Sequence, residues 1–185
     1  MNHMSFTAAL VLAALPAAAD PMLGEARKVA SEVPPKLLAV LAAEIEKGGP
    51  QSAIAVCREQ APKMAMAASQ ASGWNVRRVS LRNRNPAAVP DPWERATLEE
   101  FDRRAAAGED PKTLEKGAWV GDGAGRKYRY IKALPTMPLC LQCHGAEASL
   151  SQPVRDKLHA LYPSDRATGY ELNQIRGAMT LSRAR

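Results

Sequence analysis

Apolar residues recur at helical spacing along the first part of the chain. They repeat every three or four positions from Leu23 to Val33 and again from Leu37 to Ile45, with Pro34-Pro35 between the two runs. This pattern predicts two helices that the proline pair interrupts. Gly48-Gly49 predicts the end of the second helix, and Pro50 suits the first turn of a third.

The third helix carries an apolar stripe that includes a cysteine. Five residues at spacings of three and four share this stripe: Ala53, Ile54, Cys57, Ala61 and Met64. Arg58 and Glu59 fall outside it, so Cys57 is expected to point inward. Pro62 removes the backbone donor that would bond to the carbonyl of Arg58, and it is expected to kink this helix.

Strands are predicted in the rest of the chain, together with two more helices. The strand segments are 74–81, 119–120 paired with 127–134 around a glycine-rich turn, and 175–181. Asp91-Pro92-Trp93-Glu94 has the pattern of a capped helix start, and that helix should run to Gly108. Apolar spacing predicts a last helix from Leu150 to Leu161, and 109–117 is predicted to be a polar connector.

Helices and strands mix without regular alternation, which favours an α/β domain of the α+β kind, with a small antiparallel sheet flanked by helices. The length of 185 residues suits one domain. Hydrophobic residues make up 46% of the chain but aromatic residues only 5%. A core so poor in aromatic rings could pack around a cofactor.

The first nineteen residues carry no charge and end in Pro16-Ala17-Ala18-Ala19 before Asp20. This predicts a secretory signal peptide over 1–19, cleaved after Ala19, with residues 20–185 forming the mature domain in the periplasm. No stable membrane span is expected after cleavage. The net charge of +6 indicates a solvated basic surface, and nucleic-acid binding is not expected in an exported protein without a recognition motif.

The string Cys140-Leu141-Gln142-Cys143-His144 has the spacing of a covalent haem c site. Two thiols separated by two residues can add to the two haem vinyl groups, and His144 then lies under the iron as an axial ligand. A zinc ribbon would need a second Cys-x-x-Cys pair, which the chain lacks. A redox dithiol would leave His144 unexplained. A structural disulfide across two residues would be strained.

The second axial ligand stays open on these grounds alone. The candidates are an open site or one of five side chains: Cys57, His159, Met64, Met137 and Met179. Cys57 is left over among three cysteines once Cys140 and Cys143 bind haem. A free cysteine on an apolar helix face is also often only a small core residue.

Several separated segments together resemble the single-haem, c-type PAS-like domains of bacteria and cyanobacteria, which are found alone or as extracytoplasmic sensor regions. The matching segments span about 48–178: Gly48-Gly49-Pro50 with 53–57, Arg78-Val79-Ser80 with Arg84-Asn85-Pro86, 90–94, the CLQCH string with Gly145, Tyr162-Pro163, Asp165, Ala167, Gly169 and 176–178.

The resemblance implies a PAS-like fold with one haem c on Cys140 and Cys143, and with His144 and Cys57 as the two axial ligands. We expect Arg78, Arg84 and Asn85 to contact the haem propionates or line the pocket, since the guanidinium fork matches a carboxylate.

The expected function is redox or ligand sensing by an exported haem protein with a periplasmic redox or signalling partner. The alternative is a small electron-transfer cytochrome, and a haem enzyme acting on peroxide or nitrogen oxides is the weakest hypothesis. No catalytic residue is assigned, because two protein ligands on the iron would block a substrate.

Overall fold

The computed structural model describes residues 20–184 and shows an α+β fold, as the sequence predicts. An antiparallel sheet in the order β1-β4-β3-β2 is covered by helices on both faces. The elements in chain order are α1 (Pro21–Gly48), α2 (Pro50–Ser72), β1 (Asn75–Val79), α3 (Pro92–Ala106), β2 (Glu115–Val120), β3 (Lys127–Pro135), α4 (Leu141–His144), α5 (Gln152–Leu161) and β4 (Ile175–Ala184). The predicted signal peptide, 1–19, lies outside the described residues.

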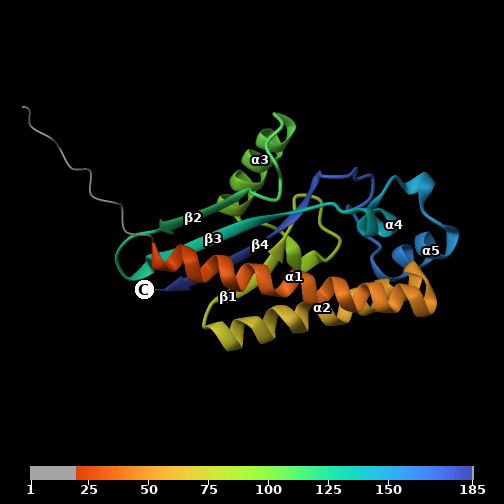
Figure 1. The fold of residues 1–185 in the computed structure, drawn as a ribbon, viewed down its shortest axis with the longest axis horizontal. Coiled ribbons are helices and arrows are strands. Elements are labelled where there is room, and N and C mark those ends of the chain that lie inside the picture. Colours follow the sequence, from red (N-terminus) through yellow and green to blue (C-terminus); the bar gives the residue numbers. More distant parts are fainter. Residues whose placement is uncertain (1–19, 185) are drawn as a thin grey trace, which may run out of the picture.

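The helices α1 and α2 form a long antiparallel hairpin. The first half of the hairpin, which holds the start of α1 and the end of α2, lies against the sheet. The second half, which holds the connection between the two helices, extends past the sheet to α4 and α5 (Figure 1). The Asp20 side chain accepts a hydrogen bond from the amide of Met22 at 2.9 Å, which caps α1, and Pro21 fills the first turn. The hairpin therefore links the sheet to the CLQCH segment at the opposite end of the molecule.

The prediction that Pro34-Pro35 interrupts a helix is wrong, because α1 continues through both prolines. The φ angle of proline is compatible with a helix, and the cost of the two prolines is the loss of two backbone hydrogen-bond donors. Val33 is buried against the sheet, and α2 packs along α1. Tertiary packing on both sides thus holds the segment helical where local propensity alone would end it. Helix α2 likewise runs through Pro62.

Two apolar layers fill the space on either face of the sheet. Between α1 and the sheet lie Trp74, Tyr128 and Tyr130, each at most 1% exposed, and Trp74 meets Tyr128 edge to face with ring centroids 6.0 Å apart. Between α3 and the sheet lie Phe101 and Ile131. Tyr128 and Tyr130 thus lie on one face of β3 and Ile131 lies on the other.

The strand predictions are close, with one correction. The hairpin of β2 and β3 forms with Trp119 opposite Tyr128, and β4 pairs with both β1 and β3. However, β2 already begins at Glu115, inside the predicted connector. Its charged residues escaped recognition because their partners come from distant helices: Glu115 accepts from Arg27 of α1, and Lys116 donates to Glu100 of α3.

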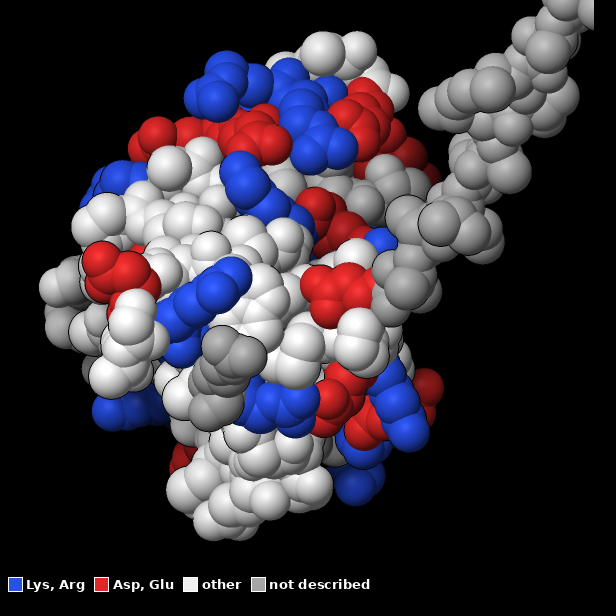
Figure 2. Space-filling view, turned by 90° about the vertical axis from the view of Figure 1, so that its left-hand side faces the viewer, with Lys and Arg blue, Asp and Glu red and all other residues white. Residues whose placement is uncertain are grey.

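Charges of both signs alternate at the end of the molecule where α1 begins. Figure 2 shows Lys and Arg side chains interspersed with Asp and Glu there, and Arg183 pairs with Glu25 at 2.6 Å. The positive net charge is thus not gathered into one patch on this face. Within 20–184, no helix combines the length and apolar character needed to cross a membrane.

Gly177 provides a stability test of the sheet. It has a φ of 154°, and a Cβ built on it would lie 2.4 Å from the carbonyl oxygen of Val79 in β1. Gly177→Ala is expected to lower the free energy of unfolding by about 1–3 kcal/mol, because backbone cannot yield as a flexible side chain does. Urea unfolding measures this. Gly24→Ala, with nothing within 4 Å, is the control and should be neutral or stabilising; equal effects would contradict the account.

Candidate functional site

An apolar cavity opens where the second half of the α1–α2 hairpin meets the CLQCH segment. It has a volume of about 350 Å³, within the usual range of small-molecule pockets. All the residues of α1 that are buried lie between Ala26 and Val33, so the apolar residues further along are covered only in part. Four of them line the cavity: Leu37, Leu38, Leu41 and Ile45. The hairpin thus presents an apolar wall that no described side chain fully covers.

The structure brings the predicted ligand residues together. Cys140, Cys143 and His144 line the cavity from α4 and the residue that precedes it, and Cys57 lines it from α2. The Sγ atom of Cys143 lies 3.9 Å from the carbonyl oxygen of Pro50, at the start of that helix. Burial raises the pKa of the Cys143 thiol. Residues far apart in the sequence therefore line one cavity.

Three contacts from distant segments hold the CLQCH backbone in place. The carbonyl of Cys143 accepts from the Arg84 guanidinium at 2.6 Å, and the amides of Tyr170 and Gly169 donate to the carbonyls of His144 and Gly145. Gly145 is needed here because a Cβ on it would lie 2.7 Å from the carbonyl oxygen of Leu141. These contacts fix where the His144 ring can point.

The His144 ring is oriented by a hydrogen bond from its Nδ1 atom. Nδ1 lies 2.7 Å from the carbonyl oxygen of Ala167, and since a carbonyl only accepts, Nδ1 carries the proton. Arg176 Nε also lies 3.1 Å from Nδ1. It cannot donate to a protonated nitrogen, and its guanidinium has other acceptors, Ser80 and the carbonyl of Arg82. The Nε2 lone pair is thus left free to bind a metal.

The imidazole of His144 is kept neutral. Burial, followed by the nearby charges of Arg176 and Arg84, holds the pKa of His144 well below its usual range. A neutral ring with its Nδ1 proton bonded to a backbone carbonyl is the form in which histidine binds metals. The ring edge also meets Tyr170, with centroids 6.4 Å apart.

The other predicted site residues take different places. Arg84 donates to Asp165 at 2.9 Å and to the Cys143 carbonyl, so its guanidinium braces the site. The Asn85 side chain accepts from the amide of Ala87, capping a short turn that borders a neighbouring cavity. Arg78 lines the apolar cavity, and its Nε atom is buried without a hydrogen-bond partner in the structure.

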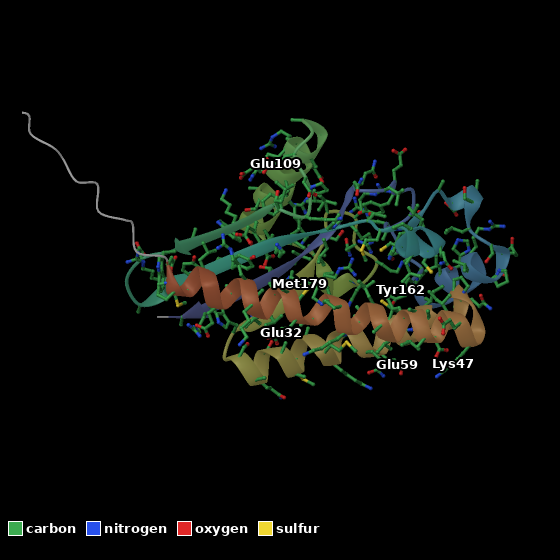
Figure 3. The ribbon with its side chains drawn as sticks, viewed as in Figure 1. Glu32, Lys47, Glu59, Glu109, Tyr162 and Met179 are labelled. Atoms are coloured by element: carbon green, nitrogen blue, oxygen red, sulfur yellow. The ribbon has the colours of Figure 1, made fainter. Side chains whose placement is uncertain are left out.

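Only some of the alternative axial ligands lie at the cavity in the structure. His159 lies on α5 with its side chain 72% exposed, and it approaches Glu147 rather than the cavity. Met64 packs against the core between α1 and the sheet. Met137 and Met179 do line the cavity, as Cys57 does. Figure 3 labels Met179, which belongs to β4, and Tyr162, which lies near the end where α4 and α5 meet the hairpin.

Arg176 is the site residue that the sequence analysis missed as a functional group. It is 5% exposed, lines the cavity and lies beside His144. Burial, followed by the charge of Arg78, lowers its pKa to about 9. The available signal was an arginine inside the apolar run from Ile175 to Leu181, since a buried charge usually has a specific partner.

These residues fit the haem c group inferred from the sequence. The donor set is a pair of thiols, a neutral histidine with a free Nε2, and a further thiol in the same cavity. The apolar wall suits a porphyrin ring, and the unpaired Nε of Arg78 is a donor for a propionate.

The Arg84 contact predicts a sizeable stability effect. Arg84→Gln removes the cationic partner of the Asp165 carboxylate. Because the side chains of Arg84 and Asp165 are only 11% and 10% exposed, the free energy of unfolding should fall by about 3 kcal/mol. Urea unfolding measures this. Arg104→Gln breaks an exposed pair with Glu109 and is the matched control, expected to have a much smaller effect. Similar losses in both variants would contradict the bracing role.

Comparison with known proteins tests the resemblance. The crystal structure of the cyanobacterial haem protein Tll0287 matches with a TM-score of 0.64 and 26% sequence identity, covering 90% of this chain and 98% of that chain. A comparison with curated proteins gives no match. The model of the Tll0287-like family matches residues 8–183. The resemblance to a family of single-haem c-type domains is therefore confirmed, and the chain belongs to the Tll0287-like family.

Proposed function

We propose that the chain binds one haem c covalently through Cys140 and Cys143, in a PAS-like domain, with His144 and Cys57 as axial ligands. The observation that carries this proposal is that all four residues line one apolar cavity although Cys57 comes from a distant helix. The similarity to a haem protein supports it. Haem would supply one-electron redox chemistry at its iron.

The residues of this chain would do four things for the group. His144 offers a neutral Nε2, oriented through Ala167. Cys57 offers a thiolate, which donates electron density and favours the oxidised iron. Arg78 and Arg176 place positive charge beside the cavity, where propionates carry negative charge. Leu37 and Leu41 contribute to the apolar wall that limits water access.

We further propose that the protein is exported to the periplasm, with cleavage after Ala19, and acts in redox or ligand sensing rather than as an enzyme. Such a cleavage leaves Asp20 at the new N-terminus, where one carboxylate oxygen caps α1 and the other accepts from Tyr128 at 2.8 Å. The mature chain would thus keep both contacts. A periplasmic redox or signalling protein is the expected partner.

Sensing and electron transfer predict different behaviour on reduction. For sensing, Cys57 would be the ligand that leaves the iron on reduction, and its place would become available to a small ligand. Cys57 and His144 border both the apolar cavity and a second cavity of about 510 Å³, so release of Cys57 would change the lining of both cavities, which favours sensing.

The test is carbon monoxide addition to the reduced, haem-loaded protein, followed by absorption. Rapid binding supports sensing. Absence of binding together with fast electron exchange with a small soluble cytochrome would contradict sensing and leave electron transfer as the function.

A further inference from the structure

Prolines interrupt the hydrogen bonding of both helices of the α1–α2 hairpin at one level. Pro34 and Pro35 lie inside α1, and Pro62 lies inside α2. Pro35 and Pro62 are nearly equally far along the chain from Gly49, which joins the two helices. Every residue of a helix adds the same rise, so residues equally distant from the connection of a helical hairpin lie at the same level. The prolines of the two helices therefore lie beside one another.

Each of these prolines removes a backbone hydrogen bond from its helix. A proline has no amide hydrogen, so the carbonyls of Ala30 and Ser31 in α1 and of Arg58 in α2 lose their usual donors. Sharp bends in helices occur mostly at such positions. The hairpin thus bends more easily at the level of the prolines than elsewhere along its length.

The two halves of the hairpin on either side of the prolines pack on different parts of the protein. In the first half, Val33 of α1 and Met64 of α2 belong to the core between α1 and the sheet. In the second half, Ile54 of α2 packs with Val154 and Leu158 of α5. The prolines thus mark the boundary between the half that lies on the sheet and the half that extends past it (Figure 1).

The second half is loosely held on its sides but closed at its tip. Among the described residues of α1, Val33 is the last that is buried, and the buried residues of α2 are Ala53 and Ile54. At the tip, the Ser52 hydroxyl donates to the carbonyl of Gly49 at 2.8 Å. The second half is therefore built to move as a unit about the prolines.

Cys57 lies between the contact with α5 and the prolines. Ile54 precedes it by one turn, and the carbonyl of the next residue, Arg58, is the one that Pro62 leaves without a donor. A bond from Cys57 to iron would hold this span at a further point. The bond exists in only one ligation state, so it favours one position of the hairpin over another, as a conformational switch requires.

We propose that the level of Pro34, Pro35 and Pro62 is a hinge, at which the second half of the hairpin moves relative to the sheet when Cys57 leaves the iron. The inference rests on the proposed ligation of the iron by Cys57. It adds the conformational change by which a change of ligand at the iron reaches the surface of the protein. Met66 follows Pro62 by one turn and is 58% exposed, so the bend changes the surface there.

Hydrogen–deuterium exchange of the haem-loaded ferric protein, followed by mass spectrometry, tests the hinge. Cys57→Ser removes the thiolate without reduction, and it should speed amide exchange in both 30–38 and 58–66 by about tenfold or more. Unchanged exchange in these segments would overturn the hinge. Faster exchange in 58–66 alone would also overturn it, because a purely local effect stays in α2.

The ferric absorption spectrum of the same samples separates the two claims. A changed spectrum with unchanged exchange would show that Cys57 binds the iron without a hinge. A Cys57→Ser spectrum identical to that of the parent would instead overturn the ligation on which the hinge rests. Haem loading is measured by mass in each sample, so loss of haem is not mistaken for a movement of the hairpin.

Restoring the missing donors tests the prolines themselves. The combined replacements Pro34→Ala, Pro35→Ala and Pro62→Ala supply three backbone N–H groups, so the increase in exchange caused by Cys57→Ser should be lost. Pro92→Ala is the matched control, because Pro92 is the first residue of α3, where an amide has no acceptor within the helix. The control should keep the increase. An increase that persists in the triple variant would overturn the proposal.

Discussion

Replacing both Cys140 and Cys143 by serine is expected to abolish covalent haem attachment completely. Thioether bonds to the haem vinyl groups need sulfur, and a serine hydroxyl cannot form them. Both side chains line the apolar cavity, and the histidine that follows them is already oriented. Without the thioethers, any haem would be held by its axial ligands and apolar contacts alone, and denaturation would release it.

Mass spectrometry of the denatured, exported protein measures this loss. The parent should carry the mass of one haem on a chain that begins at Asp20, and the double variant should show the chain mass alone. Cys57→Ser is the matched control, since it removes the third thiol and should keep the covalent haem. A double variant that retains haem after denaturation would contradict the attachment site.

Replacing Cys57 by serine is expected to raise the reduction potential by about 0.1 V or more, within the range of about 0.8 V that axial ligands span. A thiolate neutralises charge on the oxidised iron and donates electron density to it, so it stabilises the ferric state. A neutral hydroxyl does neither. The ferric state therefore loses more stabilisation than the ferrous state does.

A redox titration of the haem-loaded variant gives this shift. Ala61→Ser is the matched control, because it places the same hydroxyl on the same face of α2, one turn beyond Cys57, and should leave the potential unchanged. A Cys57→Ser variant with the parent's potential would exclude the Cys57 thiolate as an axial ligand. Met137 and Met179, which line the same cavity, would then be the candidates.

Local patterns predicted those parts of the fold whose causes are local. The helix start at Asp91 follows from its capping box, which the structure contains with both hydrogen bonds formed. The inward direction of Cys57 follows from the apolar stripe of α2, because a helical face is set by spacing alone.

The missed features depend on contacts between distant segments. Pro34-Pro35 stays helical because the sheet and α2 hold α1 from both sides, which no local pattern records. The start of β2 at Glu115 depends on Arg27, far earlier in the chain.

The hydrogen bond from His144 to the carbonyl of Ala167 cannot be read from sequence at all, since every residue has a carbonyl and only the folded path selects this one. Arg176 was visible as an arginine in an apolar strand, yet its place beside His144 required the structure.

The ferric absorption spectrum of the haem-loaded protein, compared with those of Cys57→Ser and His159→Ala, tests the central claim most directly. We predict a low-spin ferric spectrum with thiolate features in the parent, loss of those features in Cys57→Ser, and no change in His159→Ala, whose side chain is exposed. A Cys57→Ser spectrum identical to that of the parent would contradict ligation of the iron by His144 and Cys57.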